Sequence, residues 1–196
     1  MKAGILIAAA GCAERFRKAG GEGNKLNALL NNDSVFAQTL RHAQASGLEV
    51  HVVTRPENTH IQALCHAQQV PVTLIASAGL GESIAAGVCA TAHWQGWLIH
   101  LADMPFVAPA LFIEVADALE FHTLARPCVG EHPGHPVGFA RQWFEKLSQL
   151  SGDNGARELL RAEAVHLIAA GDADSQRDID LPSHLAQRSE NNHAAS

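Results

Sequence analysis

The feature that most constrains the fold is the alternation of strand-length apolar runs with segments of helical length over the first 120 residues. The apolar runs are short and nearly continuous, a pattern typical of strands buried on both faces of a sheet. Strands and helices in strict alternation, with short connections, indicate a mostly parallel sheet covered on both faces. The predicted strands are residues 2–9, 49–54, 70–76 and 96–102, and the predicted helices are residues 34–46, 56–68, 82–92 and 109–120.

The second half of the chain departs from this regular order. Shorter strand and helix signals surround a turn rich in Gly and Pro, so we expect a small irregular β insertion that forms one wall of a cleft. Its strands are predicted at 126–130, 136–140 and 165–169, and its helices at 142–149 and 154–163. The sequence thus predicts an α/β fold with a single doubly wound, mostly parallel sheet. This domain spans residues 1–186, and a polar, flexible tail follows at 187–196.

Composition supports one domain and excludes two classes of partner. The 196 residues are 47% hydrophobic and 17% charged, which suffices for one domain with a full core. The net charge of −6 and the scattered basic residues argue against a nucleic-acid surface. No apolar stretch approaches the roughly 20 residues of a membrane helix, and the first residues lack a signal-peptide pattern. We therefore expect a cytoplasmic protein with neither a nucleic-acid nor a membrane partner.

A loop of small residues follows the first predicted strand. Residues 8–11, Ala-Ala-Ala-Gly, let a ligand approach the backbone, whose N–H groups can cradle a phosphate or meet a nucleobase. Arg15 and Lys25 can then neutralise the anion. The loop matches neither better-known phosphate motif, because Gly-x-Gly-x-x-Gly is absent and Lys25 lies between Asn24 and Leu26. The alternative is tight packing of small residues beside a solvated loop.

Two further segments follow later strands. The glycine pair that begins at Gly79 lets the backbone approach a ligand, and Ser83 offers a hydroxyl at the amino end of a helix. Asp103 follows the fourth predicted strand, and Pro105 turns the chain away, which leaves the carboxylate at the rim of the sheet. A hard oxygen ligand there suits Mg²⁺ held together with nucleotide phosphates. As alternatives, Ser83 and Glu82 cap the helix, and Asp103 caps a turn.

All three segments should meet, since ligands of open α/β sheets bind at the carboxyl ends of the strands. Together with four further motifs in the same order, they resemble the nucleotidyltransferases that activate cofactors and sugars, and most closely the molybdenum cofactor cytidylyltransferases. The resemblance runs from residue 4 to about residue 185. The matching motifs are Ala-Ala-Ala-Gly-x3-Arg at 8–15, Asn-Lys-Leu at 24–26, Gly-x-Gly-Glu-Ser-Ile at 79–84, Leu-Ala-Asp-Met-Pro at 101–105, Gly-His-Pro-Val-Gly-Phe at 134–139, Gly-Asp-Asn-Gly-Ala-Arg at 152–157 and Asp-Ile-Asp-Leu-Pro at 178–182.

The resemblance implies a Rossmann-like, Mg²⁺-dependent nucleotidyltransferase. Such an enzyme transfers CMP from CTP to the terminal phosphate of molybdopterin-bound molybdenum cofactor and releases pyrophosphate, and a molybdoenzyme would receive the product. The reaction brings two anions together, so positioning and charge neutralisation matter more than a covalent nucleophile. Three alternatives stay open: another acceptor such as a sugar or alcohol phosphate, GTP as the donor, and a nucleotide-binding regulatory module without turnover.

The resemblance also implies roles by position. Asp103 and, as a second ligand, Asp180 would bind Mg²⁺, and His135 would face the acceptor. The stretch before Lys25 is longer than in the family, so Arg15, Arg17 and Lys18 are alternative contacts of the triphosphate. The Ala-Ala-Gly form of the first loop is associated in this family with cytidine rather than guanosine donors. The implied catalytic residues are Arg15, Lys25 and Asp103, and the implied nucleotide-binding residues are Ala9, Ala10, Gly11, Arg15, Lys25, Gly79 and Ser83.

Overall fold

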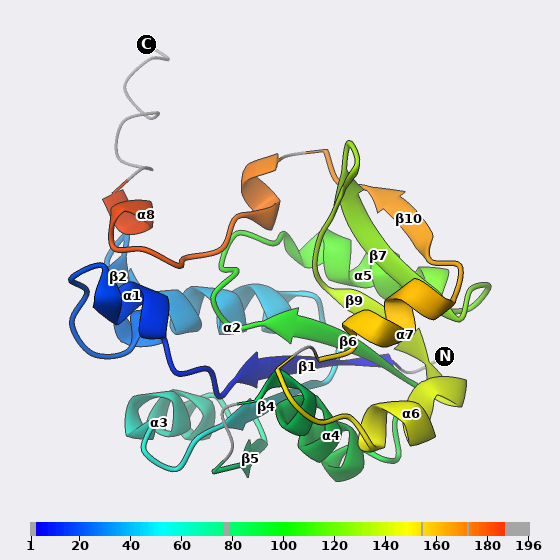
Figure 1. Ribbon diagram of the computed structural model, residues 1–196, viewed down its shortest axis with the longest axis horizontal. Helices are drawn as coiled ribbons and strands as arrows, with labels where there is room; N and C mark the ends of the chain where they lie inside the picture. The colour runs from blue at the N-terminus through cyan, green and yellow to red at the C-terminus, as the bar shows by residue number, and fades with distance from the viewer. Residues whose placement is uncertain (1–2, 77–78, 154, 172, 187–196) are drawn as a thin grey trace.

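The computed structural model describes residues 3–76, 79–153, 155–171 and 173–186 (Figure 1). Within these residues, one eight-stranded sheet has the order β10-β7-β9-β6-β1-β4-β5, with β8 paired to β7. The predicted fold class is confirmed, because β1 pairs in parallel with both β4 and β6, and β4 pairs in parallel with β5. The strands are β1 (Ala3–Ala9), β4 (Val50–Thr54), β5 (Val72–Leu74), β6 (Gly96–Leu101), β7 (Leu124–Val129), β8 (His132–Pro133), β9 (Val137–Ala140) and β10 (His166–Ala169); β2 (Leu29–Leu30) and β3 (Asp33–Ser34) form a separate hairpin.

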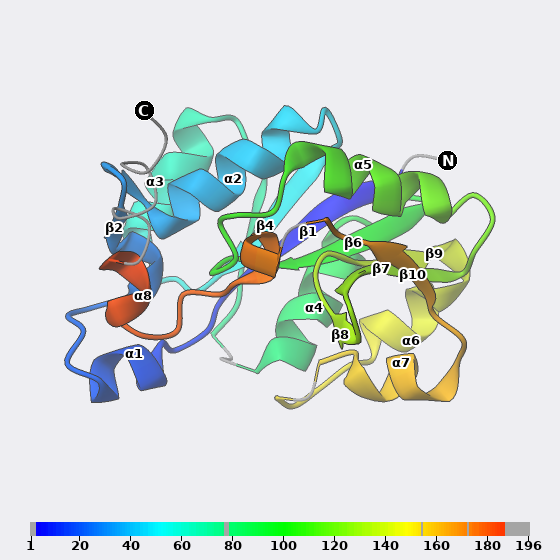
Figure 2. The same cartoon turned by 90° about the horizontal axis from the view of Figure 1, so that it is seen from above.

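Helices cover both faces of the sheet, as Figure 2 shows. The helices α2, α3 and α5 pack on one face, and α4, α6 and α7 pack on the other. No helix in the described part of the chain is long and apolar enough to cross a membrane. The helices are α1 (Glu14–Lys18), α2 (Val35–Ala45), α3 (Thr59–Ala67), α4 (Leu80–Ala90), α5 (Pro109–Ala118), α6 (Phe144–Ser148), α7 (Arg157–Ala162) and α8 (Ser183–Ala186), with short 3₁₀ helices η1 (Lys25–Asn27), η2 (Arg141–Trp143) and η3 (Ala173–Gln176).

The central strands are apolar throughout because successive side chains enter two different cores. On β1, Ile5 and Ile7 belong to the core that includes Phe112 of α5, whereas Leu6 belongs to the core that includes Val88 of α4. All five side chains are fully buried. A strand that supplies two cores cannot alternate apolar with polar residues, which explains the continuous apolar runs in the sequence.

Several predicted boundaries differ from the structure. Ser34 is the N-cap of α2 as predicted, and its Oγ accepts a hydrogen bond from the Ala37 N–H at 3.1 Å. The helix predicted from Pro56 begins instead at Thr59, and α4 begins two residues before its predicted start. The stretch before Lys25, predicted as a loop, contains the short helix α1. The predicted tail at 187–196 lies outside the described residues.

The strands of the second half, predicted as a small irregular β insertion, extend the main sheet. β9 pairs antiparallel with both β6 and β7, and β10 pairs in parallel with β7. These strands join the sheet because they supply both cores: Leu124 packs with the α4 side and the neighbouring Ala125 with the α5 side. The carboxyl ends of β1 and β6 therefore stay open, and α1 and α8 flank them in Figure 1.

Candidate active site

A cleft of about 540 Å³ opens at the carboxyl ends of β1 and β6. Its lining combines the loop after β1, the first turn of α4, the turn after β6 and the C-terminal segment before α8. The three segments expected to share one edge of the sheet therefore do so. Among the predicted site residues, Gly79 and His135 are not part of the lining; those that line the cleft are Ala9, Ala10, Gly11, Arg15, Lys25, Ser83, Asp103 and Asp180.

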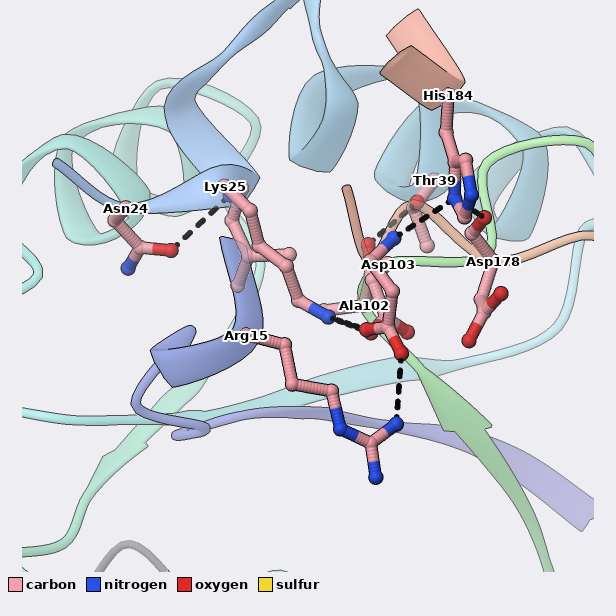
Figure 3. A network of polar contacts seen from close by, with 10 residues as sticks. Arg15, Asn24, Lys25, Thr39, Ala102, Asp103, Asp178 and His184 are labelled. Carbon is pink, nitrogen blue, oxygen red and sulfur yellow. Dashed lines mark hydrogen bonds and ion pairs between the residues drawn. The ribbon is translucent and has the colours of Figure 1, made fainter. Parts of the chain in front are cut away.

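The charged residues of the cleft form one network around Lys25. Its Nζ lies 2.5 Å from Oδ2 of Asp103 and 2.6 Å from Oδ1 of Asp180. The other oxygen of Asp180 accepts a hydrogen bond from Arg15 Nη1 at 3.1 Å. Figure 3 shows Arg15, Lys25 and Asp103 converging from three elements of the chain. The Lys25 side chain is only 14% exposed whereas that of Arg15 is 82% exposed, so Lys25 is the enclosed cation of the site and Arg15 the exposed one.

The pKa shifts follow from burial and pairing. Burial alone would lower the pKa of Lys25, but the carboxylates of Asp103 and Asp180 outweigh it and raise that pKa, so the ammonium stays charged. Burial raises the pKa of Asp103, and Lys25 offsets this only in part. Burial also acts to raise the pKa of Asp180, yet Lys25 and Arg15 bring it below its usual value. Asp103 is therefore the carboxylate whose charge most needs a cation.

The backbone around Asp103 is held from three sides. The carbonyl of Ala102 accepts a hydrogen bond from Thr39 Oγ1 of α2 at 2.8 Å, and the carbonyl of Asp103 accepts one from Ile179 N–H at 2.9 Å. The ring nitrogen Nε2 of His100 lies 3.2 Å from the carbonyl of Met104. Thr39 and His100 are buried, so these contacts fix the turn that presents the carboxylate.

The two carboxylates fit a divalent cation. Asp103 Oδ1 is buried and has no hydrogen-bond partner among the described residues. Asp103 and Asp180 both contact the same ammonium nitrogen, so one cation already bridges them. No cluster of three or more His, Cys, Asp and Glu side chains in the described segments could hold a metal unaided. Mg²⁺ needs no such cluster, because it takes one or two carboxylates and completes its shell with phosphates and water.

Of the three cations proposed for the triphosphate, Arg15 is the one that faces the cleft. Arg17 lines a smaller neighbouring cavity of about 170 Å³, and Lys18 lies 3.6 Å from the carboxylate of Glu14 one helical turn earlier. All three residues belong to α1, and a helix points successive side chains in different directions. Of the three, Arg15 therefore lines the cleft, and its contact with the triphosphate stays a prediction.

The glycine pair before α4 makes room for protein backbone in this structure. A Cβ on Gly81 would lie 2.6 Å from the carbonyl of Ser151, and one on Gly79 would overlap the carboxylate of Glu82. The Gly81 N–H donates to the carbonyl of Gly152 at 2.8 Å, and Glu82 Oε1 accepts from the N–H of Gly152 at 3.0 Å. The pair therefore clamps the 151–152 loop to α4, and contact of Gly79 with a nucleotide stays a prediction.

Two further residues at this wall bear on the ligand. Ser83 lines the cleft, but its hydroxyl donates to the carbonyl of Gly79 at 2.9 Å, which leaves its oxygen as an acceptor. Asp153 also lines the cleft and was not assigned a role in the sequence analysis. Its position within the matched Gly-Asp-Asn-Gly-Ala-Arg motif was the signal that could have found it.

His135 belongs to a turn that is fastened away from the cleft lining. Its Nδ1 lies 3.3 Å from the carbonyl of Ile99, and its N–H donates to Gln176 Oε1 at 2.7 Å. Arg126 donates from Nε and Nη2 to the carbonyl of Gly134 at 3.0 and 2.8 Å. Burial lowers the pKa of His135 to about 4, so its ring is neutral at pH 7. Contact of His135 with an acceptor stays a prediction.

Comparison with known proteins identifies the family. Residues 5–168 match the family described as "MobA-like NTP transferase domain", and the chain belongs to this family of nucleotidyltransferases. Enzymes of this type generally use a divalent metal. No curated protein matches the sequence significantly.

Solved structures confirm the fold. Rv0371c from Mycobacterium tuberculosis H37Rv aligns with a TM-score of 0.79 at 22% identity, over 92% of this chain and 94% of that protein. A nucleotidyl transferase from Methanothermobacter thermautotroptrophicus gives a TM-score of 0.78 at 20% identity, over 93% of both chains. A 4-diphosphocytidyl-2C-methyl-D-erythritol synthase from Anaerococcus prevotii DSM 20548 gives 0.70 at 16% identity, over 94% of both.

We expect His100 to make the protein less stable in mild acid. Burial lowers the pKa of this fully buried ring to about 3, whereas the unfolded chain takes up the proton near pH 6.5. The unfolded state therefore binds more protons in mild acid. His100 alone lowers the free energy of unfolding by about 2 kcal/mol between pH 7 and pH 5, and the buried ring of His135 adds a further fall of the same sign. Guanidinium unfolding at pH 7 and pH 5 measures this difference.

His100→Gln should reduce the difference between the two pH values by about 2 kcal/mol. His60→Gln, which changes an exposed histidine on α3, should leave it unchanged. If the free energy of unfolding of His100→Gln still fell as much between pH 7 and pH 5 as that of the unchanged protein, His100 would not be the source of this pH dependence.

Proposed function

We propose that this protein transfers CMP from CTP to the terminal phosphate of molybdopterin-bound molybdenum cofactor and releases pyrophosphate. The observation that carries the proposal is Lys25 Nζ held between Asp103 and Asp180, beside the small-residue loop that ends β1. This arrangement places a fixed cation for phosphate oxygens and two carboxylates for a divalent metal at one edge of the sheet. Such a set of groups suits the transfer of a nucleotidyl group.

Each charged residue has a defined task in the proposed reaction. Lys25 and Arg15 neutralise the oxygens of the triphosphate, which competes with the carboxylates for both cations. Asp103 and Asp180 hold Mg²⁺, which supplies charge stabilisation at the phosphate oxygens when bound. The backbone N–H groups of Ala10 and Gly11 lie where the nucleotide would approach the end of β1.

The chemistry itself asks little more of the protein. A terminal phosphate oxygen of the acceptor attacks the α-phosphorus of CTP, and the bond from that phosphorus to the bridging oxygen breaks. Pyrophosphate leaves with the electron pair of that bond. The phosphate is already an anionic nucleophile, so alignment and charge compensation carry the catalysis and no covalent intermediate is needed.

The choice of CTP over GTP rests on the first loop. Ala10 lines the cleft at the end of β1, where its methyl group would narrow the space beside a bound base. A pyrimidine tolerates this better than a purine, and the Ala-Ala-Gly sequence is the cytidine-associated form. A difference of one methyl group in the shape of a site discriminates between ligands by only about 10–200-fold. Stronger preference for CTP over GTP would need hydrogen bonds to the base.

Molybdopterin is the proposed acceptor on the strength of the sequence resemblance. A structural neighbour is a 4-diphosphocytidyl-2C-methyl-D-erythritol synthase, which makes an alcohol phosphate the second candidate acceptor. A recipient molybdoenzyme would then take up the cytidylylated cofactor.

Release of pyrophosphate tests donor and acceptor together. The purified protein with Mg²⁺ is offered CTP or GTP, each with molybdopterin carrying molybdenum, a sugar phosphate or an alcohol phosphate. We expect turnover with CTP and molybdopterin, and slower turnover with GTP. GTP used as well as CTP would contradict the cytidylyl assignment, and turnover only with another acceptor would contradict the molybdopterin assignment. Absence of turnover with every pair, despite CTP binding, would favour a regulatory module.

Asp103→Asn tests the metal assignment. We expect this change to reduce Mg²⁺-dependent turnover by on the order of 10²-fold or more, because an amide cannot replace a charged ligand at a metal. Nucleotide binding measured in EDTA should change far less. Asp117→Asn, on the exposed surface of α5, is the matched control and should behave like the unchanged protein. Equal damage with and without Mg²⁺ would instead indicate that Asp103 only caps its turn.

A further inference from the structure

The asparagine at the start of α3 does not cap its helix. Asn58 is the N-cap residue of α3, yet its side chain makes no capping hydrogen bond. Asparagine is among the residues that most favour this role, and the uncapped first turn forgoes a bond typically worth about 1 kcal/mol. Local rules of this kind are broken most often at functional sites. The direction in which the amide does point is therefore informative.

The amide of Asn58 is turned toward the nucleotide loop. Its Nδ2 donates to Thr54 Oγ1 at 3.0 Å and to the carbonyl of Ala9, the last residue of β1, at 3.3 Å. Thr54 Oγ1 donates to the same carbonyl at 3.1 Å. Asn58 Oδ1 accepts a hydrogen bond from Nδ2 of Asn24 at 3.0 Å. The Thr54 bond is buried and the bonds of Asn58 are partly buried, so water competes for them less than on the open surface.

Asn24 continues the connection to Lys25. Its Oδ1 accepts from the N–H of Leu26 at 3.0 Å, which makes Asn24 the N-cap of the 3₁₀ helix that begins at Lys25. Figure 3 shows this amide beside Lys25. A chain of hydrogen bonds thus runs from the carbonyl of Ala9, through Asn58 and Asn24, to the turn that carries the central cation.

This connection matters because the intervening segment is poorly anchored. Between Gly11 and Asn24, Phe16 is the single buried residue. Its other contacts outside the segment are at Cys12, whose Sγ accepts from Arg55 Nη1 at 2.9 Å, and at the exposed Arg15, which pairs with Asp180. A loop with one buried side chain and two polar contacts does not by itself fix its end as closely as a preorganised charge contact requires. The bridge between Asn24 and Asn58 supplies a further anchor on one side of Lys25, while the buried Leu26 anchors the other side.

We infer that Asn58 is a positioning residue for nucleotide binding, which acts through Asn24 to hold Lys25 toward the triphosphate. The inference rests on the proposed function, because it assumes that Lys25 contacts the triphosphate. It assigns to Asn58 and Asn24 no contact with the nucleotide itself. Their removal should therefore matter only while Lys25 is present.

A double-mutant cycle tests this dependence. The measured quantity is the Kd of CTP in the presence of Mg²⁺, by isothermal titration calorimetry, for the unchanged protein, Asn58→Ala, Lys25→Ala and the double variant. We expect Asn58→Ala to weaken binding by on the order of tenfold alone, and by less than about twofold in the Lys25→Ala background. Circular dichroism and thermal unfolding verify that each variant is folded.

Two further variants sharpen the test. Asn24→Ser keeps an N-cap oxygen for the Leu26 N–H but is too short to reach Asn58, so it should reproduce the effect of Asn58→Ala, even if the latter folds poorly. Gln62→Ala removes another amide of α3, whose bonds run to the carbonyls of Arg55 and Pro56, and should leave the Kd unchanged.

The outcomes separate the inference from the proposed function. If Lys25→Ala weakens binding, and Asn58→Ala weakens it by the same factor with and without Lys25, then Asn58 only supports the loop. The inference is then wrong. Normal binding by Asn58→Ala and Asn24→Ser would also overturn it, while the proposed function stands. Normal binding by Lys25→Ala would overturn both, since Lys25 would then not contact the triphosphate.

Discussion

The site depends on one ammonium group shared by two carboxylates. Lys25 lies in a 3₁₀ turn, Asp103 follows β6 and Asp180 belongs to the C-terminal segment, so three distant parts of the chain meet at one nitrogen. Partial burial of a charge costs free energy of solvation unless an opposite charge lies nearby. Here the ammonium offsets that cost for both carboxylates, and they offset it for the ammonium. In the proposed complex, the triphosphate would pair with Lys25 and the divalent cation would pair with the two carboxylates. The network therefore pairs these charges without ligand and keeps them in place for it.

The fold supplies this meeting point through strands buried on both faces. β1 supplies both cores, so its body is buried, and the small residues at its end line the cleft at the edge of the sheet. Polar side chains then fix the groups around it: the buried Thr39 and His100 hold the Asp103 turn, and the partly exposed Glu82 clamps the 151–152 loop to α4.

The sequence predicts local features well and the bonds between distant segments poorly. Continuous apolar runs predicted the parallel core, and the order of strands placed the segments around Lys25, Ser83 and Asp103 at one edge. The antiparallel insertion of β9 depends on pairing across the sheet, which periodicity does not reveal. The glycines at 79 and 81 looked suited to a ligand, yet they admit the backbone of residues about 70 positions later. The direction of the Asn58 side chain is likewise set by contacts with distant segments, which replace the N-cap hydrogen bond that its position favours.

A crystal structure with Mg²⁺ and a CTP analogue that cannot be cleaved between the α- and β-phosphates tests the central claim most directly. The account predicts that Lys25 Nζ leaves at least one carboxylate and contacts a phosphate oxygen, that Asp103 and Asp180 both ligate the metal, and that the base lies beside Ala10. A nucleotide bound elsewhere, or bound in this cleft with Lys25 still held between both carboxylates and no metal at Asp103, would contradict it.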